Sequence, residues 1–115
     1  MAIVGNLGND NMQKCIDECV KCLRACEECL TLCMNEEEVK KMVSCMKILR
    51  DCIDICETAI GFMARGSEHA AHICKECAEI CDACAAECEK MTTDHCKKCA
   101  EICRSCADEC NKMVG

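Results

Sequence analysis

Residues 74–88 read CKECAEICDACAAEC, and residues 96–110 read CKKCAEICRSCADEC. In each stretch cysteine recurs at steps of 3, 4, 3 and 4 residues. This is the a/d spacing of a heptad pattern, which lines up the cysteines along one stripe of an α-helix. Because the two stretches are similar and each fits one helix, they indicate an internal duplication within a helical bundle rather than a solenoid.

The same spacing extends through the N-terminal half of the chain. Residues 15–33 carry six cysteines at steps of 4, 3, 4, 3 and 4. Residues 42–63 keep the register but mix the residue types on the stripe. Four helices with one narrow apolar stripe each can bury those stripes only against one another. We therefore predict an all-α protein, an up-down-up-down four-helix bundle with a cysteine-lined core.

Loop residues set the expected helix boundaries. Asn35, followed three residues later by Glu38, matches the capping box that starts many helices. Gly66 fits the C′ position that ends a helix, and Ser67 would cap the next one. Either residue of Thr92–Thr93 would cap the last helix. Within a single domain of residues 1–115, the expected helices span residues 10–34, 36–65, 68–90 and 93–113.

The 19 cysteines among 115 residues require a chemical explanation. One or two cysteines on such a stripe would be ordinary small core residues. Leucine or isoleucine at the same positions would bury more apolar area, at about 25 cal/mol per Å². A sequence that gives up this stabilisation on all four helices needs sulfur for its function.

Several sulfur chemistries fit this chain poorly. Disulfide-dense domains are usually secreted and loop-rich, and the odd number of cysteines is also unusual for them. Iron–sulfur sites usually draw cysteines from loops. A catalytic thiol needs a nearby base, and the histidines, His69, His72 and His95, lie outside the cysteine stripes. We therefore predict that the protein is not an enzyme.

Metal binding remains, and thiolates select soft ions such as Cu(I) and Zn(II). A Zn(II) ion on four unshared thiolates leaves a charge of about −2, so several such sites in one dry core would repel each other. A Cu(I) ion that replaces one thiol proton leaves the core neutral. This argument favours many Cu(I) ions in the core, while a zinc or cadmium buffer of the metallothionein type and a thiol redox protein stay open as alternatives.

Charge and hydropathy restrict the partners. The chain has 14 basic and 21 acidic residues, a net charge of −7, so we expect no nucleic-acid partner. No apolar run approaches the roughly 20 residues that span a bilayer, so we expect no membrane partner. The first residues lack the basic and apolar segments of a secretory signal, and we expect a cytoplasmic protein.

The helix expected at residues 36–65 has apolar residues beyond its stripe. Val43, Met46, Ile53 and Ile60 lie on one flank, and further apolar residues follow at Ile48, Ile55 and Phe62. A helix that is apolar on most of its surface is buried on more than one side. Extra packing within the bundle and a subunit interface are both open, and the interface is favoured because a small bundle has only one core.

The cysteine ladders from Cys15 to Cys110 resemble those of the bacterial copper storage protein family over nearly the whole chain. The resemblance implies a four-helix bundle that fills with Cu(I) and assembles as a homotetramer, and it is to the cytosolic branch. Family members place Met or His at one mouth of the bundle. Here that mouth offers Met34, Met42, Met91 and His95.

The predicted function is therefore cytosolic storage and sequestration of Cu(I), with protection against copper toxicity and supply of cuproenzymes. The copper donor would be a copper chaperone or a low-molecular-weight carrier. At the opposite end, Met12, Met63 and Met113 are expected to fill space, and His69 and His72 to be solvated. The expected metal ligands are Cys15, Cys19, Cys22, Cys26, Cys29, Cys33, Cys45, Cys52, Cys56, Cys74, Cys77, Cys81, Cys84, Cys88, Cys96, Cys99, Cys103, Cys106 and Cys110, with Met42, Met91 and His95 at the mouth.

Overall fold

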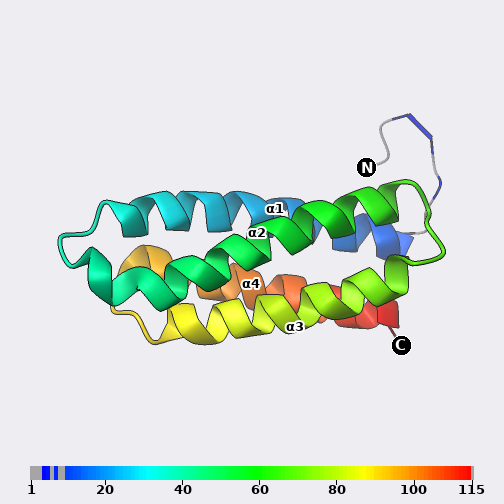
Figure 1. Cartoon of the computed structure of the whole chain (residues 1–115). Coiled ribbons are helices and arrows are strands. Elements are labelled where there is room, and N and C mark those ends of the chain that lie inside the picture. Colours follow the sequence, from blue (N-terminus) through cyan, green and yellow to red (C-terminus); the bar gives the residue numbers. More distant parts are fainter. Residues whose placement is uncertain (1–3, 6, 8–9, 115) are drawn as a thin grey trace.

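A computed structural model describes residues 4–5, 7 and 10–114 of the chain (Figure 1). Within this part, all the regular structure is helical. The molecule is elongated, with extents of 46 × 26 × 17 Å. The elements in chain order are α1 at Asp10–Met34, the 3₁₀-helix η1 at Val39–Met42, α2 at Val43–Ala64, α3 at Ala70–Glu89 and α4 at Asp94–Val114.

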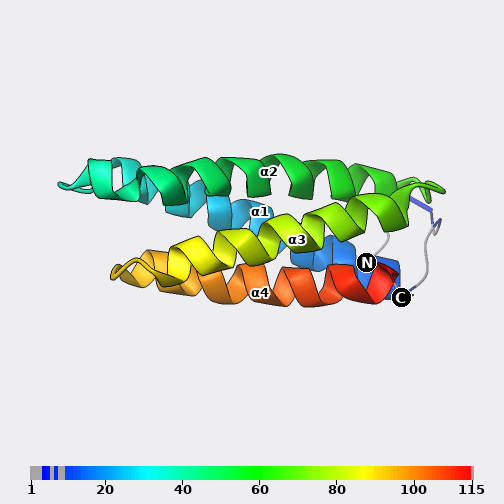
Figure 2. The same ribbon diagram turned by 60° about the horizontal axis from the view of Figure 1, so that its bottom comes forward.

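The helices form an antiparallel ring in which each packs against its chain neighbours. Helix α1 contacts α2 and α4, and α3 contacts the same two helices from the opposite side. Figure 2 shows the four helices running side by side with short connections at both ends. This arrangement confirms the predicted up-down-up-down bundle. All four narrow stripes face one common axis.

Local signals correctly located the turn between α2 and α3. Gly66 has a φ of 65°, in the left-handed region that glycine tolerates best. Its N–H donates to the carbonyl of Met63, and the N–H of Ser67 donates to the carbonyl of Phe62. These two bonds form the Schellman motif that closes a helix C-terminus. Ser67 is not the predicted helix cap: its hydroxyl accepts a bond from the N–H of His69, and His69 is the N-cap residue of α3, which begins at Ala70.

The start of α4 follows the predicted cap. The hydroxyl of Thr93 accepts a hydrogen bond from the N–H of Cys96, at 3.4 Å. This is the bond of an N-cap residue to the third helical position. Helix α4 therefore begins at Asp94 and holds Cys96 in its first turn. Capping thus fixes where the first cysteine of this helix stands.

The predicted capping box at the start of α2 is wrong. The side-chain amide of Asn35 donates to the carbonyl of Thr31 and so serves the end of α1 instead. Glu38 pairs with Lys41 at 3.0 Å and lies before η1 rather than inside a helix. The chain therefore uses residues 35–38 as a loop, and the regular α-helix starts only at Val43.

The core consists mainly of cysteine side chains. All 19 cysteines are buried, each 2% exposed or less, together with aliphatic residues of α2 such as Leu49 and Ile53. Among the described side chains, none that is polar or charged is classed as buried. No helix in the described part of the chain has the length and apolar character needed to cross a bilayer. The bundle therefore holds a dry, uncharged column of thiols along its axis.

Candidate metal centre

All 19 cysteines are free thiols, and their sulfurs form two ladders along the bundle axis. The longer ladder alternates between α1 and α4. At one end, the Cys110 sulfur lies 3.5 Å from that of Cys15 and 3.8 Å from that of Cys19. The Cys19 sulfur in turn lies 3.6 Å from that of Cys106. Each sulfur on this ladder therefore has neighbours on the opposite helix, as bridging ligands require.

The α1–α4 ladder continues through the middle of the bundle. Cys103 contacts Cys22 at 3.7 Å and Cys26 at 3.8 Å, and Cys26 reaches Cys99 at 3.9 Å. Sulfurs at i and i+4 on one helix also approach each other, with 4.0 Å between Cys99 and Cys103. Because contacts run both across and along the helices, these sulfurs form one connected cluster rather than isolated pairs.

The second ladder joins α2 and α3 and is shorter. Cys81 contacts Cys52 at 3.6 Å and Cys56 at 4.0 Å, and Cys56 contacts Cys77 at 3.9 Å. Toward the loop that precedes α2, Cys45 and Cys88 form a separate pair at 3.3 Å. Leu49, fully buried, occupies the stripe position between this pair and the rest of the ladder.

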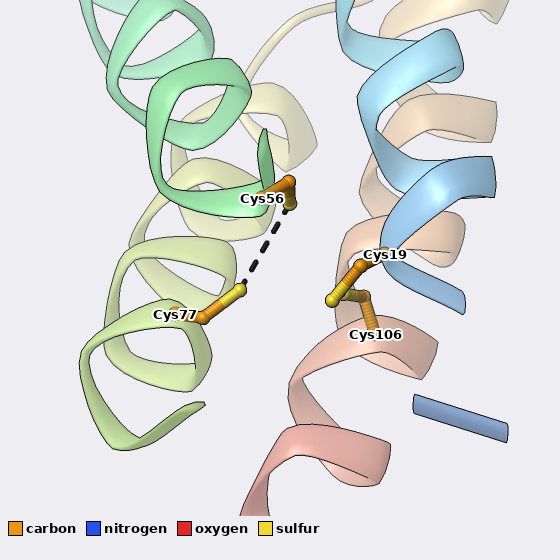
Figure 3. A group of neighbouring side chains, drawn as sticks. All are labelled: Cys19, Cys56, Cys77 and Cys106. Atoms are coloured by element: carbon orange, nitrogen blue, oxygen red, sulfur yellow. Dashed lines mark hydrogen bonds between the residues drawn. The ribbon is translucent and has the colours of Figure 1, made fainter. Parts of the chain in front are cut away.

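The two ladders meet on the bundle axis. Cys22 of α1 lies 3.7 Å from Cys52 of α2. Four helices thus contribute to common sulfur quartets, and Figure 3 shows one sulfur from each helix pointing toward the axis in such a group. The quartets whose ligand atoms all lie within 4.8 Å of one another include Cys19, Cys56, Cys77 and Cys106; Cys22, Cys52, Cys56 and Cys81; and Cys22, Cys26, Cys52 and Cys103.

Burial and hydrogen bonds between neighbouring thiols change the pKa values of the thiols, some upward and some downward. Hydrogen bonds to neighbouring sulfurs, above all Cys103, lower the pKa of Cys99 to about 6. Burial, followed by the charge of Cys96, raises the pKa of Cys33 to about 12. Hydrogen bonding with Cys110 makes the largest contribution to the raised pKa of Cys74. Neighbouring thiols therefore differ in how readily each gives up its proton to an incoming metal ion.

One end of the bundle, which we call the mouth, is formed by the end of α1, the loop and η1 before α2, the end of α3 and the start of α4. Here the ring of His95 faces the last sulfurs of the column. Its Nδ1 atom lies 3.6 Å from the sulfur of Cys29 and 3.6 Å from that of Cys96. Its Nε2 atom donates a hydrogen bond to Oε1 of Glu36, at 3.0 Å. His95 therefore belongs to the sulfur column, although its sequence position lies off the stripe.

The methionines at the mouth occupy different positions. Met42 is 5% exposed and continues the core, and Met91 is half-buried against it. Both line a surface pocket whose rim carries charged residues of the two loops, among them Glu36 and Lys90. Met34 is 52% exposed, outside the core.

The opposite end is closed by methionine side chains. Met63 is fully buried, and Met12 and Met113 pack half-buried against the core. His69 and His72 are exposed, which confirms the prediction that they are solvated. At this end, the sulfurs of Cys15, Cys19 and Cys110 lie within 4.8 Å of one another.

Sequence reasoning missed Glu36. The helix expected at residues 36–65 would place Glu36 in its first turn, where the helix dipole favours acidic residues. Its real position in a loop lets Glu36 reach across to His95, which is 59 residues away in sequence. Only the folded arrangement of the two loops at the mouth brings these residues together.

Comparison with known proteins supports this description of the core. A family model described as copper storage protein matches residues 8–115. The uncharacterized cysteine-rich protein YhjQ of Bacillus subtilis (strain 168) is 40% identical over 83 residues, which cover 72% of this chain and 77% of YhjQ.

Solved structures share the fold at clear sequence identity. The Cu(I)-bound copper storage protein BsCsp3 superposes with a TM-score of 0.88 at 38% identity, covering 92% of this chain and all of that chain (100%). A cytosolic copper storage protein from Streptomyces lividans, described with five coppers, gives a TM-score of 0.88 at 32% identity, covering 91% of this chain and 92% of that one.

Proposed function

The chain belongs to the copper storage protein family, and from this premise we propose that it stores and sequesters Cu(I) as thiolate complexes along its axis. The observation that carries the proposal is the close clustering of buried thiols along the bundle axis. Thiols from all four helices form clusters with sulfur separations of 3.3–4.0 Å, and two quartets within 4.8 Å share Cys56 and so connect neighbouring clusters. A chain of soft ligands this close allows each sulfur to bridge two metal ions.

Charge favours Cu(I) over zinc as the cargo of the core. Interior quartets such as that of Figure 3 are fully buried. Filling each with one Zn(II) would place a charge of about −2 in every dry layer. Each Cu(I) instead replaces one thiol proton, so the core stays neutral at every stage of filling. Storage in this form would keep free copper low and hold a reserve for cuproenzymes.

The mouth is the proposed route of copper entry. Thioether and imidazole groups bind Cu(I) more weakly than thiolates do, so they can pass the ion inward rather than retain it. Met42 and Met91 line the surface pocket, and the ring of His95 contacts the last sulfurs of the column. The donor would be a copper chaperone or a small copper carrier. The protein carries no catalytic residue under this proposal.

The proposed setting is the cytosol, and the proposed assembly is a homotetramer. The compartment follows the Streptomyces lividans relative, which is described as cytosolic. Several apolar side chains lie exposed outside the core, and a subunit interface would cover them. On α1 these include Val20 at 50% and Leu32 at 48%, and on α2 Val43 at 45%.

An anaerobic titration of reduced, metal-free protein with Cu(I), under a competing chelator, tests the function. We expect binding to approach about one Cu(I) per cysteine, by counting two sulfurs per metal and two metals per sulfur. Saturation at about four or five ions would indicate separate four-sulfur sites of the zinc type and would contradict the proposal.

A matched pair of variants tests whether copper capacity depends on thiols inside the column or only on the number of thiols. Cys52→Ser removes the sulfur that joins the two ladders and should lower the capacity by about one to two ions. Ser105→Cys adds a thiol on the exposed face of α4, outside the column. It should bind no additional copper under the chelator, because a lone exposed thiol has no partner sulfur.

A further inference from the structure

One ligand group differs from the others in its donor atoms. The mouth quartet consists of Cys29, Cys33, His95 and Cys96, whose ligand atoms all lie within 4.8 Å of one another. It combines three thiols with one imidazole, whereas the interior quartets contain sulfur alone. Three cysteines and one histidine are a common donor set for tetrahedral Zn(II) in proteins.

Four of the six ligand-atom separations in the mouth quartet are close to those around a tetrahedral ion, and the other two are within 4.8 Å. Zn–S bonds of about 2.3 Å and Zn–N bonds of about 2.0–2.1 Å place two sulfurs about 3.8 Å apart and sulfur and nitrogen about 3.5 Å apart. The Cys96 sulfur lies 3.8 Å from that of Cys29 and 3.7 Å from that of Cys33. The Nδ1 atom of His95 lies 3.6 Å from two of these sulfurs. The imidazole thus stands where a fourth ligand would.

Glu36 supplies an independent indication of a metal site. Its carboxylate accepts the Nε2 hydrogen of His95, which leaves the Nδ1 lone pair directed at the sulfurs. A carboxylate that holds the far nitrogen of a ligand histidine is a recurrent partner in zinc sites, where it fixes the ring and raises its basicity. The side chain of His95 is 19% exposed, so an ion can reach this group from the solvent side.

The charge argument against zinc in the interior does not apply at the mouth. Three thiolates, one neutral imidazole and one Zn(II) sum to about −1, not −2. His95 and Cys96 lie in the first turn of α4, where the helix dipole favours negative charge, whereas Cys29 and Cys33 lie near the C-terminus of α1, where it does not. Solvent reaches this end and lowers the cost of the remaining charge. A single divalent ion is therefore acceptable here.

We propose that the mouth quartet is a site for one divalent zinc ion, distinct in metal preference from the all-sulfur column behind it. The metal-poor protein carries this ion, and Cu(I) that fills the end of the column displaces it. The displacement rests on the proposed function, because the same sulfurs are the last ligands of the copper column. Binding of the divalent ion does not depend on that function.

Cobalt(II) is the probe for this site, because tetrahedral thiolate complexes of cobalt absorb in the visible and near ultraviolet. Reduced, metal-free protein is titrated anaerobically with Co(II), followed by Zn(II). We expect tetrahedral bands that saturate at about one equivalent and disappear after about one equivalent of Zn(II). His95→Phe should abolish this site, and Glu36→Gln should weaken Co(II) binding about 10- to 100-fold.

Cys81→Ser, in an interior quartet, is the control and should leave the Co(II) titration unchanged. A titration that saturates at four or five equivalents, or one that His95→Phe leaves intact while Cys81→Ser abolishes it, overturns the proposal. Cu(I) capacity is measured on the same samples. Loss of Cu(I) storage with an intact cobalt site contradicts the proposed function alone, whereas full Cu(I) storage without a one-equivalent cobalt site contradicts this inference alone.

Discussion

Leu49 shows how a single residue can divide the sulfur column. It is fully buried at a stripe position of α2, between Cys45 and Cys52. Its isobutyl group fills the space that a thiol would take at the corresponding place on the other helices. The consequence is a smaller number of ligands on α2 and a Cys45–Cys88 pair set apart from the rest of the α2–α3 ladder.

Leu49→Cys should therefore raise the copper capacity. The new thiol would connect Cys45 with Cys52, so about one additional Cu(I) should bind under the same chelator. The metal-free variant should be less stable, by up to about 2 kcal/mol, because a smaller side chain leaves a cavity. Anaerobic titration and urea unfolding measure the two effects. An unchanged capacity would show that the column does not extend through this position.

The mouth residues define a second prediction at this scale. Replacing Met42, Met91 and His95 with Leu, Leu and Phe removes the weak ligands but keeps the apolar volume. Copper uptake and chelator-driven removal should slow, with capacity nearly unchanged. Stopped-flow or manual mixing with a chromophoric chelator measures both rates.

The matched control changes the opposite end, at Met63, His69 and Met113. Slower uptake in this control alone would mean that copper enters there. Equal rates in both variants and the parent protein would mean that copper passes between the helices as the bundle opens transiently.

The positions of the sulfurs could be predicted from sequence, but the surroundings of His95 could not. Cysteines spaced by three and four residues must share one face of a helix, and four such faces must meet. His95 stands one residue before this register and was placed outside the stripes. Its ring nevertheless reaches Cys29, because the first turn of α4 lies next to α1 at the mouth. Contacts between loops and helix ends depend on the directions of side chains, which the spacing of residues along the sequence does not specify.

At the scale of the helices, one residue ties α4 to α3. The guanidinium of Arg104 donates to Asp82 at 3.0 Å and to both carboxylate oxygens of Glu89. The hydrogen bond from Arg104 lowers the pKa of Glu89 below its usual value. The same contacts raise the pKa of Arg104, which stays charged. The duplicated helices α3 and α4 thus gain a charged link on their outer surface.

The sign of the pH effect follows from Glu89. Its pKa is lower in the folded than in the unfolded state, so the link stabilises the fold above the unfolded pKa of about 4.3. This stabilisation disappears as the pH falls through the folded pKa. Arg104→Gln should therefore lower the free energy of unfolding at pH 7 and differ less from the parent protein near pH 3. Urea unfolding of the reduced, metal-free proteins at both pH values measures this.

Arg24→Gln is the control, because Arg24 and Glu28 form an exposed pair within α1 alone. Such pairs contribute little, about 0.3–0.5 kcal/mol. An Arg104→Gln effect that is no larger than the control, or that grows toward low pH, would contradict the proposed link between the helices.

The helix ends show which sequence signals are sufficient to predict a helix boundary. Gly66 was predicted correctly, since a left-handed glycine has few alternatives, and Thr93 is one of the two residues predicted to cap α4. Asn35 had an alternative, because its amide could bond either forward to a new helix or back to α1. It bonds back to Thr31. The competition between two neighbouring helix ends for one side chain cannot be decided from the sequence.

For the molecule as a whole, the predicted topology followed from short loops, since they allow only antiparallel neighbours. The spacing of the cysteines along the sequence could not show how a core of small side chains is shielded from solvent. Around the sulfur column, half-buried aliphatic residues pack against its outside from every helix, and the larger ones include Ile16, Leu23, Ile48, Ile55, Ile73, Ile80 and Ile102. The apolar layer therefore lies outside the ligands rather than at the centre.

This arrangement predicts that the protein folds before copper arrives. Reduced thiols are neutral and apolar enough to be buried, and the aliphatic layer and helix caps need no metal. Reduced, metal-free protein should therefore give a strongly helical circular dichroism spectrum, unlike small zinc domains that fold only with metal. Copper should then raise the unfolding temperature by binding the native state alone. A random-coil spectrum that becomes helical only on adding Cu(I) would show instead that the metal supplies the folding energy.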